Sequence, residues 1–156
     1  MRIMFVCTGN TCRSPLAEAI ARDLASRKQV ADVEIGSAGT SAWSEAPASD
    51  GALLVGLERG LDLNTHRARQ LSSELVERAD LILAMGPHHL ERIEALGGVG
   101  KAHLLTGYAS HGRDARAISD PFGGNLDVYR AAADELTREI ERVFDRIMSG
   151  RTSENP

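Results

Sequence analysis

Four short apolar segments, separated by longer stretches with helical periodicity, set the pattern of the chain. The first, Arg2–Val6, is apolar at nearly every position, as expected for a strand whose two faces are both covered. The other three are Asp32–Ser37, Asp80–Met85 and Lys101–Leu105. Strands that alternate with helices predict a single α/β domain, with a central four-stranded parallel sheet flanked by helices.

The segments between the strands have the apolar spacing and the end signals of helices. The first helix is expected to begin at Ser14, a suitable N-cap that is followed by Pro15. Further helices are expected over Pro47–Arg59, Ser72–Arg78 and Pro87–Leu96. The last helix has the clearest pattern, with apolar residues at alternating spacings of four and three between a cap at Asn125 and a stop at Gly150.

Length and composition favour one soluble domain. The chain has 156 residues, of which 42% are hydrophobic and 26% charged, and we expect a domain over residues 1–150 with a polar tail over 151–156. The net charge of −4 argues against partners such as nucleic acid or an anionic membrane, which require a basic face. There is no apolar run of about 18 residues and no signal peptide. We therefore expect a monomeric cytoplasmic protein, whose cysteines stay reduced.

The turn after the first strand contains the candidate catalytic and ligand-binding residues. It reads Cys7-Thr8-Gly9-Asn10-Thr11-Cys12-Arg13-Ser14-Pro15. Ligands of parallel sheets bind at the carboxyl ends of strands, and the unpaired amides at a helix start favour an anion there. Gly9 and Asn10 tolerate the dihedral angles that curl successive N–H groups inward. The turn is therefore a predicted phosphate-binding loop.

Cys7 is the candidate nucleophile of this loop. A helix start and a nearby arginine stabilise a thiolate, which can attack phosphorus. Arg13 offers a planar fork of donors for two phosphoryl oxygens, and Ser14 can donate a hydrogen bond to the sulfur. Cys7 and Cys12 without further ligands at suitable spacing make a weak metal site, so neither a metal nor another cofactor is expected.

The pattern C-x5-R-S at this place resembles the low-molecular-weight protein tyrosine phosphatases. The resemblance is strongest over Val6–Pro15 and continues, in family order, at Ser37-Ala38-Gly39-Thr40, at His66-Arg67-Ala68-Arg69-Gln70 and at Asp120-Pro121. It implies a phosphatase domain over residues 1–150 that acts on phosphorylated proteins. The phosphoryl group would pass through a phosphocysteine at Cys7.

The resemblance also implies roles for individual residues. Phosphate or substrate would be bound by Thr8, Gly9, Asn10, Thr11, Cys12, Arg13, Ser14 and Phe122. Asp120 would protonate the leaving group and then activate water, although Asp-Pro before two glycines also suits a plain turn. His66 would support the loop through Asn10, together with Ser37. The other histidines, His88, His89, His103 and His111, are interpreted as surface or loop residues.

Two features bear on which phosphorylated residue is the substrate. Tyrosine-specific members usually carry an aliphatic residue where this chain has Thr11, and often two tyrosines where it has Phe122 and Gly123. Thr11 with the sequence Asp-Pro-Phe-Gly-Gly is similar to the bacterial protein-arginine phosphatases. A phosphoguanidinium suits the hydroxyl of Thr11 and the carboxylate of Asp120. The alternative is phosphotyrosine, with Thr11 as a neutral β-branched substitute.

Three other hypotheses start from the same residues. Related arsenate reductases use further cysteines in mid-chain, which this sequence lacks. A phosphate-binding module without activity should have lost Cys7, Arg13 or Asp120, and all three are present. Cys12 is either a partner for a regulatory disulfide with Cys7 or a small buried apolar residue.

Overall fold

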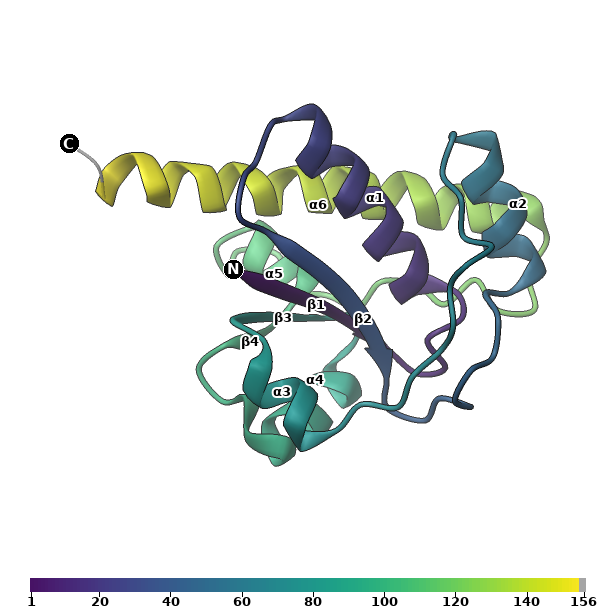
Figure 1. Ribbon diagram of the computed structural model, residues 1–156, viewed down its shortest axis with the longest axis horizontal. Coiled ribbons are helices and arrows are strands. Elements are labelled where there is room, and N and C mark those ends of the chain that lie inside the picture. The colour runs from purple at the N-terminus through teal and green to yellow at the C-terminus, as the bar shows by residue number, and fades with distance from the viewer. Residues whose placement is uncertain (155–156) are drawn as a thin grey trace.

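The computed structural model describes residues 1–154 and contains one four-stranded sheet (Figure 1). The strands are β1 (Arg2–Cys7), β2 (Glu34–Gly39), β3 (Leu81–Ala84) and β4 (Ala102–Leu104). Their order is β2-β1-β3-β4 and every neighbouring pair is parallel. The predicted α/β fold with a four-stranded parallel sheet is confirmed.

Helices cover both faces of the sheet. They are α1 (Arg13–Arg27), α2 (Asp50–Glu58), α3 (Ser73–Arg78), α4 (Pro87–Ile93), α5 (Leu105–Ala109) and α6 (Leu126–Glu154), with a π-helical turn at Glu94–Gly98. Figure 1 shows α1 and α6 on one side of the sheet and α3 and α4 on the other. The two layers of helices explain why β3 is apolar throughout and β1 is apolar after Arg2.

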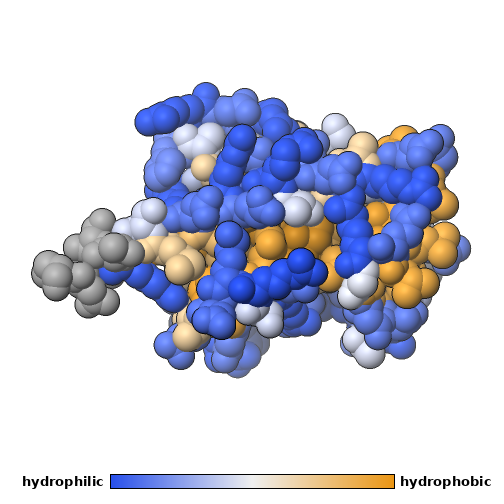
Figure 2. Space-filling view, turned by 90° about the horizontal axis from the view of Figure 1, so that it is seen from above, coloured by the Kyte–Doolittle hydropathy of each residue, from blue (hydrophilic) through white to orange (hydrophobic). Residues whose placement is uncertain are grey.

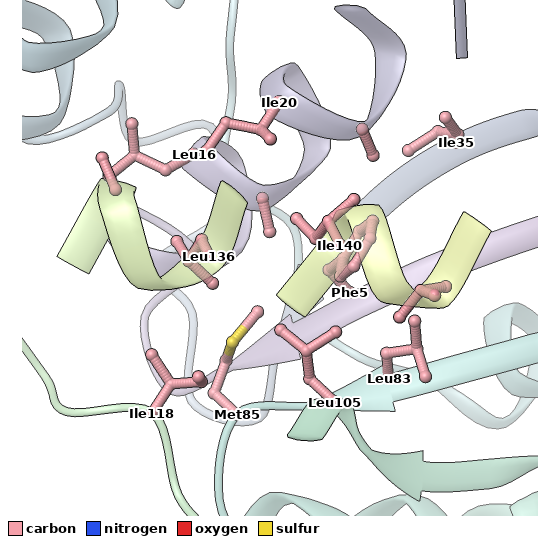
Figure 3. Close-up of a cluster of buried hydrophobic side chains, with 14 of the residues drawn as sticks. Phe5, Leu16, Ile20, Ile35, Leu83, Met85, Leu105, Ile118, Leu136 and Ile140 are labelled. Carbon is pink, nitrogen blue, oxygen red and sulfur yellow. The ribbon is translucent and has the colours of Figure 1, made fainter. Parts of the chain in front are cut away.

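The side chains of β1 alternate between two hydrophobic cores. Phe5 points to the larger core, where it lies with Leu16 of α1 and Ile140 of α6 (Figure 3). Met4 and Val6 point to a second core on the α3 and α4 side. Because successive side chains of a strand face opposite ways, β1 is buried on both faces and its carboxyl end is held in a fixed place.

Several predicted boundaries are wrong. Ser14 is not the N-cap of α1, because the helix begins at Arg13 and Cys12 is its N-cap; the Ser14 hydroxyl is used in the loop instead. α6 does not stop at Gly150 but continues to Glu154, since one glycine costs a helix about 1 kcal/mol and does not end it. The predicted polar tail is thus helical as far as Glu154, and its last two positions, 155–156, lie outside the described residues.

The surface is mainly polar but not evenly so. On the face seen in Figure 2, hydrophobic residues gather over the end of the molecule that carries α2. On this helix Leu54 and Leu57 are exposed. Over the residues described here, no helix is both long enough and apolar enough to cross a membrane.

Candidate active site

The loop between β1 and α1 curls back on itself at the carboxyl edge of the sheet. The carbonyl oxygens of Cys7 and Thr8 accept hydrogen bonds from the amides of Thr40 and Ser41, each at 2.9 Å. Asn10 has a φ of 56°, a left-handed conformation that asparagine adopts more readily than most residues. The segment after β2 therefore anchors the loop, and Asn10 turns it.

The curled loop and residues 120–122 enclose a pocket of about 220 Å³. Its lining residues are Cys7, Thr8, Gly9, Thr11, Cys12, Arg13, Asp120 and Phe122. The fold thus brings Asp120, from a distant part of the sequence, to the same pocket as Cys7 and Arg13. The side chains of Asn10 and Ser14 are instead fully buried behind the loop.

A directed pair of hydrogen bonds ends at the sulfur of Cys7. Asn10 Nδ2 donates to Ser14 Oγ at 2.7 Å, and Ser14 Oγ lies 2.9 Å from Cys7 Sγ. Because an amide nitrogen can only donate, the serine accepts from Asn10 and its own proton is left for the sulfur. The sulfur of Cys7 is therefore the acceptor at the end of this pair of hydrogen bonds.

Besides its contact with Ser14, Asn10 is held by two other segments, β2 and residues 66–69. Its Nδ2 also donates to Ser37 Oγ at 2.9 Å, and its Oδ1 accepts from the backbone amide of Arg69 at 3.0 Å. The backbone carbonyl of Asn10 lies 2.7 Å from His66 Nε2. Ser37 Oγ in turn donates to Glu18 Oε1 at 2.8 Å. Every polar atom of the buried Asn10 side chain thus has a partner, which fixes the turn of the loop.

Arg13 lies almost completely buried in the first turn of α1, with 5% of its surface exposed. Its Nη1 donates to the carbonyl of Ile118 at 2.9 Å, and its Nη2 is 3.6 Å from Asp120 Oδ2. Within the described part of the chain, Nε has no hydrogen-bond partner. A buried donor on a charged group is costly to leave unpaired. An anion in the pocket, which Arg13 lines, is a suitable acceptor for it.

Asp120 is half-exposed at the pocket mouth. Its Oδ1 accepts a hydrogen bond from the amide of Phe122 at 3.1 Å, which orients the carboxylate. The segment before it is tied down by Arg116, whose guanidinium forms ion pairs with Glu135 and Glu139 of α6. Thr106 Oγ1 also bonds both the amide and the carbonyl of Arg116. The loop that carries Asp120 therefore has fixed contacts on its N-terminal side.

The second cysteine belongs to a different cluster. Cys12 Sγ lies 3.3 Å from Ser49 Oγ and 3.4 Å from the hydroxyl of Tyr129. Burial and the contact with Cys12 raise the pKa of Tyr129, so its hydroxyl stays protonated. Both cysteines are buried free thiols. A regulatory disulfide between Cys7 and Cys12 stays a prediction.

One histidine was misinterpreted from the sequence. His89 is not a surface or loop residue: it is fully buried in the first turn of α4, and its Nε2 lies 2.8 Å from Thr8 Oγ1. The Gly-Pro pair before His88 signals the start of this helix, but the sequence does not say that β3 lies beside β1. His88 and His111 are exposed, and His103 is half-buried in β4.

Comparison with known proteins gives the same family along nearly the whole chain. The family model described as low molecular weight phosphotyrosine protein phosphatase matches residues 2–152. A protein-arginine-phosphatase of Geobacillus stearothermophilus is 41% identical over 95% of this chain and 97% of its own. The low molecular weight protein-tyrosine-phosphatase PtpB of Staphylococcus haemolyticus is 39% identical over 92% of this chain and 97% of its own.

A solved structure shares the fold over almost its full length. It is the YwlE arginine phosphatase, in a mutant with serine for cysteine and a phosphorylated active site serine. The TM-score is 0.90 at 36% identity, over 97% of this chain and 99% of that one. Sequence, fold and pocket agree: the chain belongs to the low molecular weight phosphotyrosine protein phosphatase family.

Proposed function

We propose that this protein is a cysteine-dependent phosphatase that removes the phosphoryl group from phosphoarginine in proteins. The observation that carries the proposal is the buried Nε of Arg13, which has no hydrogen-bond partner among the described residues. Arg13 lines the same pocket as Cys7. A phosphoryl oxygen satisfies this donor. It also places the phosphorus close to a sulfur that accepts a hydrogen bond from Ser14.

In the first step the Cys7 thiolate attacks the phosphorus, and the bond from phosphorus to the guanidine nitrogen breaks. Asp120 gives its proton to the departing nitrogen, so that the arginine side chain leaves as an ordinary guanidinium cation. The pairing of Arg13 with two phosphoryl oxygens offsets the repulsion between thiolate and phosphate. The products are arginine and a phosphocysteine at Cys7.

In the second step the Asp120 carboxylate takes a proton from water, which attacks the phosphocysteine. The bond from sulfur to phosphorus breaks and inorganic phosphate leaves. Ser14 stabilises the returning thiolate through its hydrogen bond of 2.9 Å. The carboxylate is protonated again, so the enzyme is restored after one water has been consumed.

The preference for phosphoarginine rests on the pocket wall. Thr11 places a hydroxyl on the pocket wall, where an aliphatic side chain would suit a phenyl ring. Asp120 keeps one carboxyl oxygen as an acceptor while the other carries the proton for the leaving group. A guanidinium has several N–H donors and no acceptor, so these two oxygens are suitable partners for it. The relative named as an arginine phosphatase agrees with this choice, whereas PtpB is named for tyrosine. The cytoplasmic location and the monomeric state remain predictions.

The test is kcat/KM of the reduced protein on phosphoarginine and phosphotyrosine peptides of the same sequence. Thr11→Ile is compared with Thr11→Val, which keeps the branched shape and removes the hydroxyl. We expect wild type to prefer phosphoarginine and both variants to lose that preference by about tenfold or more, the effect of one polar contact. A phosphotyrosine preference that neither variant changes would make the protein a tyrosine phosphatase with the same mechanism.

A further inference from the structure

His89 has an unusual environment for a residue without a part in the proposed reaction. It is fully buried, and the adjacent His88 on the same helix is exposed. β3 pairs with β1, and the amide of Met85 donates to the carbonyl of Val6 at 3.0 Å. The chain that leaves β3 therefore runs beside the start of the phosphate-binding loop, which brings the imidazole against Thr8.

The contact between His89 and Thr8 is short and specific. His89 Nε2 lies 2.8 Å from Thr8 Oγ1, and Thr8 lines the pocket. Through the whole described range no partner is found for the other ring nitrogen, Nδ1. Besides a contact with the ring of His88, the buried imidazole thus has Thr8 as its side-chain hydrogen-bond partner among the described residues, and Thr8 lines the candidate active site. Burying a polar group in this way has a cost, which a role at the pocket explains.

The protonation of the ring determines what Thr8 can do. Burial, with contributions from His88 and Arg13, lowers the pKa of His89 to about 4, and Asp120 opposes this shift. The ring is therefore neutral at pH 7 and carries one N–H. An unpaired N–H is a rarer group in protein interiors than an unpaired acceptor, which favours a lone pair on Nδ1 and the proton on Nε2. His89 then donates, and the Thr8 hydroxyl keeps its own proton free.

We propose that His89 is a positioning residue for the bound phosphoryl group, acting through Thr8. Its Nε2–H holds Thr8 Oγ1 on the pocket wall, and the Thr8 hydroxyl donates its proton to a phosphoryl oxygen. Thr8 is thereby a side-chain ligand of phosphate in addition to Arg13. The inference rests on the proposed phosphatase function, but it concerns anion binding and is tested without turnover.

The experiment is a double-mutant cycle on the affinity for inorganic phosphate, measured by calorimetry with the reduced protein. The variants are Thr8→Val, His89→Phe and the pair together. We expect each single change to weaken phosphate binding by about tenfold, as for one hydrogen bond to a charged oxygen. The double variant should bind no more weakly than either single variant, because both remove the same interaction.

Two further variants separate positioning from packing. His89→Gln, whose amide can place an N–H near the position of Nε2, should recover most of the phosphate affinity. Glu91→Gln, at an exposed position of the same helix, is the control and should bind phosphate as wild type does. Hydrolysis of para-nitrophenyl phosphate by each variant should fall in kcat/KM in parallel with the phosphate affinity.

Two results would overturn the inference. One is wild-type phosphate affinity in Thr8→Val. The other is a double variant whose loss equals the product of the two single losses, since His89 would then act independently of Thr8. Failure of the proposed function is a different outcome: wild type would bind phosphate, with the expected cycle, and hydrolyse no phosphorylated substrate.

Discussion

Arg13 donates a hydrogen bond from Nη1 to the carbonyl oxygen of Ile118, at 2.9 Å. Ile118 is buried, and its amide donates to the carbonyl of Met85 at 2.8 Å. Asp120 follows two positions later. Arg13 of the loop and the carboxylate of the proposed acid are thus connected through Ile118, so we expect a change at Arg13 to disturb Asp120.

This relationship predicts that Arg13→Lys damages both binding and chemistry. A lysine keeps the charge but has no planar fork, so it cannot bond Ile118 and two phosphoryl oxygens together. We expect kcat/KM to fall by about 100-fold or more, with both KM and kcat affected. Steady-state kinetics on the preferred phosphopeptide test this. A loss confined to KM would mean that the contact with Ile118 does not position Asp120.

Cys7→Ser should abolish turnover and leave phosphate binding intact. The serine hydroxyl is a much weaker nucleophile than a thiolate, but the loop amides and Arg13 do not change. We expect no measurable hydrolysis and a dissociation constant for phosphate within about threefold of wild type. Rate assays and calorimetry on the same preparation check the two halves. Residual turnover near the wild-type rate would reject Cys7 as the nucleophile.

Asp120→Asn should slow the chemical steps with little effect on affinity. The amide keeps the size of the side chain and can still accept from the amide of Phe122, but it cannot donate a carboxyl proton. General acid catalysis is worth about 10²–10⁴ in rate, so kcat should fall by that factor for a poor leaving group. With para-nitrophenyl phosphate, whose leaving group needs less help, the loss should be smaller. An equal loss on both substrates would argue against a role in proton transfer.

The protonation of His89 predicts a pH dependence of stability. Its pKa is about 4 in the folded protein and about 6.5 in the unfolded chain, so the unfolded chain binds more protons between these values. The free energy of unfolding should therefore fall by about 2–3 kcal/mol as the pH drops from 6.5 to 4, and change little from this cause below 4.

Urea unfolding of wild type and of His89→Gln at a series of pH values measures how much His89 contributes to the free energy of unfolding. The glutamine does not titrate, so the difference between the two proteins should shrink or reverse as the pH is lowered. Other titrating groups contribute equally to both proteins and cancel. Parallel curves over the whole range would contradict the burial of a neutral imidazole at this position.

Much of the fold was predictable because its strands and long helices have strong local patterns. Two corrections show where such patterns fail. β2 was predicted over Asp32–Ser37 but is Glu34–Gly39, since its end is set by pairing with β1, where Cys7 lies opposite Gly39. α5 was not predicted at all, because five residues with a central glycine carry no helical period.

The site could be predicted as far as it lies in one segment. The residues between Cys7 and Arg13 are contiguous, and their types indicate anion binding without knowledge of the fold. The contacts of Asn10 with Glu18, through Ser37, and those of Thr8 with His89 depend on the order of the strands. Nothing in a single sequence gives that order, so Glu18 and His89 were not predicted as parts of the site.

The place of β1 in the chain has a consequence for synthesis. This central strand, which ends at the proposed nucleophile Cys7, precedes both neighbouring strands in the sequence, and α6, which covers the Phe5 face, follows them all. A growing chain carries Cys7 for roughly ten seconds at ordinary rates of translation before α6 is complete. The loop that would make this thiol reactive takes shape only as the core closes, so until then Cys7 is no more reactive than an ordinary cysteine.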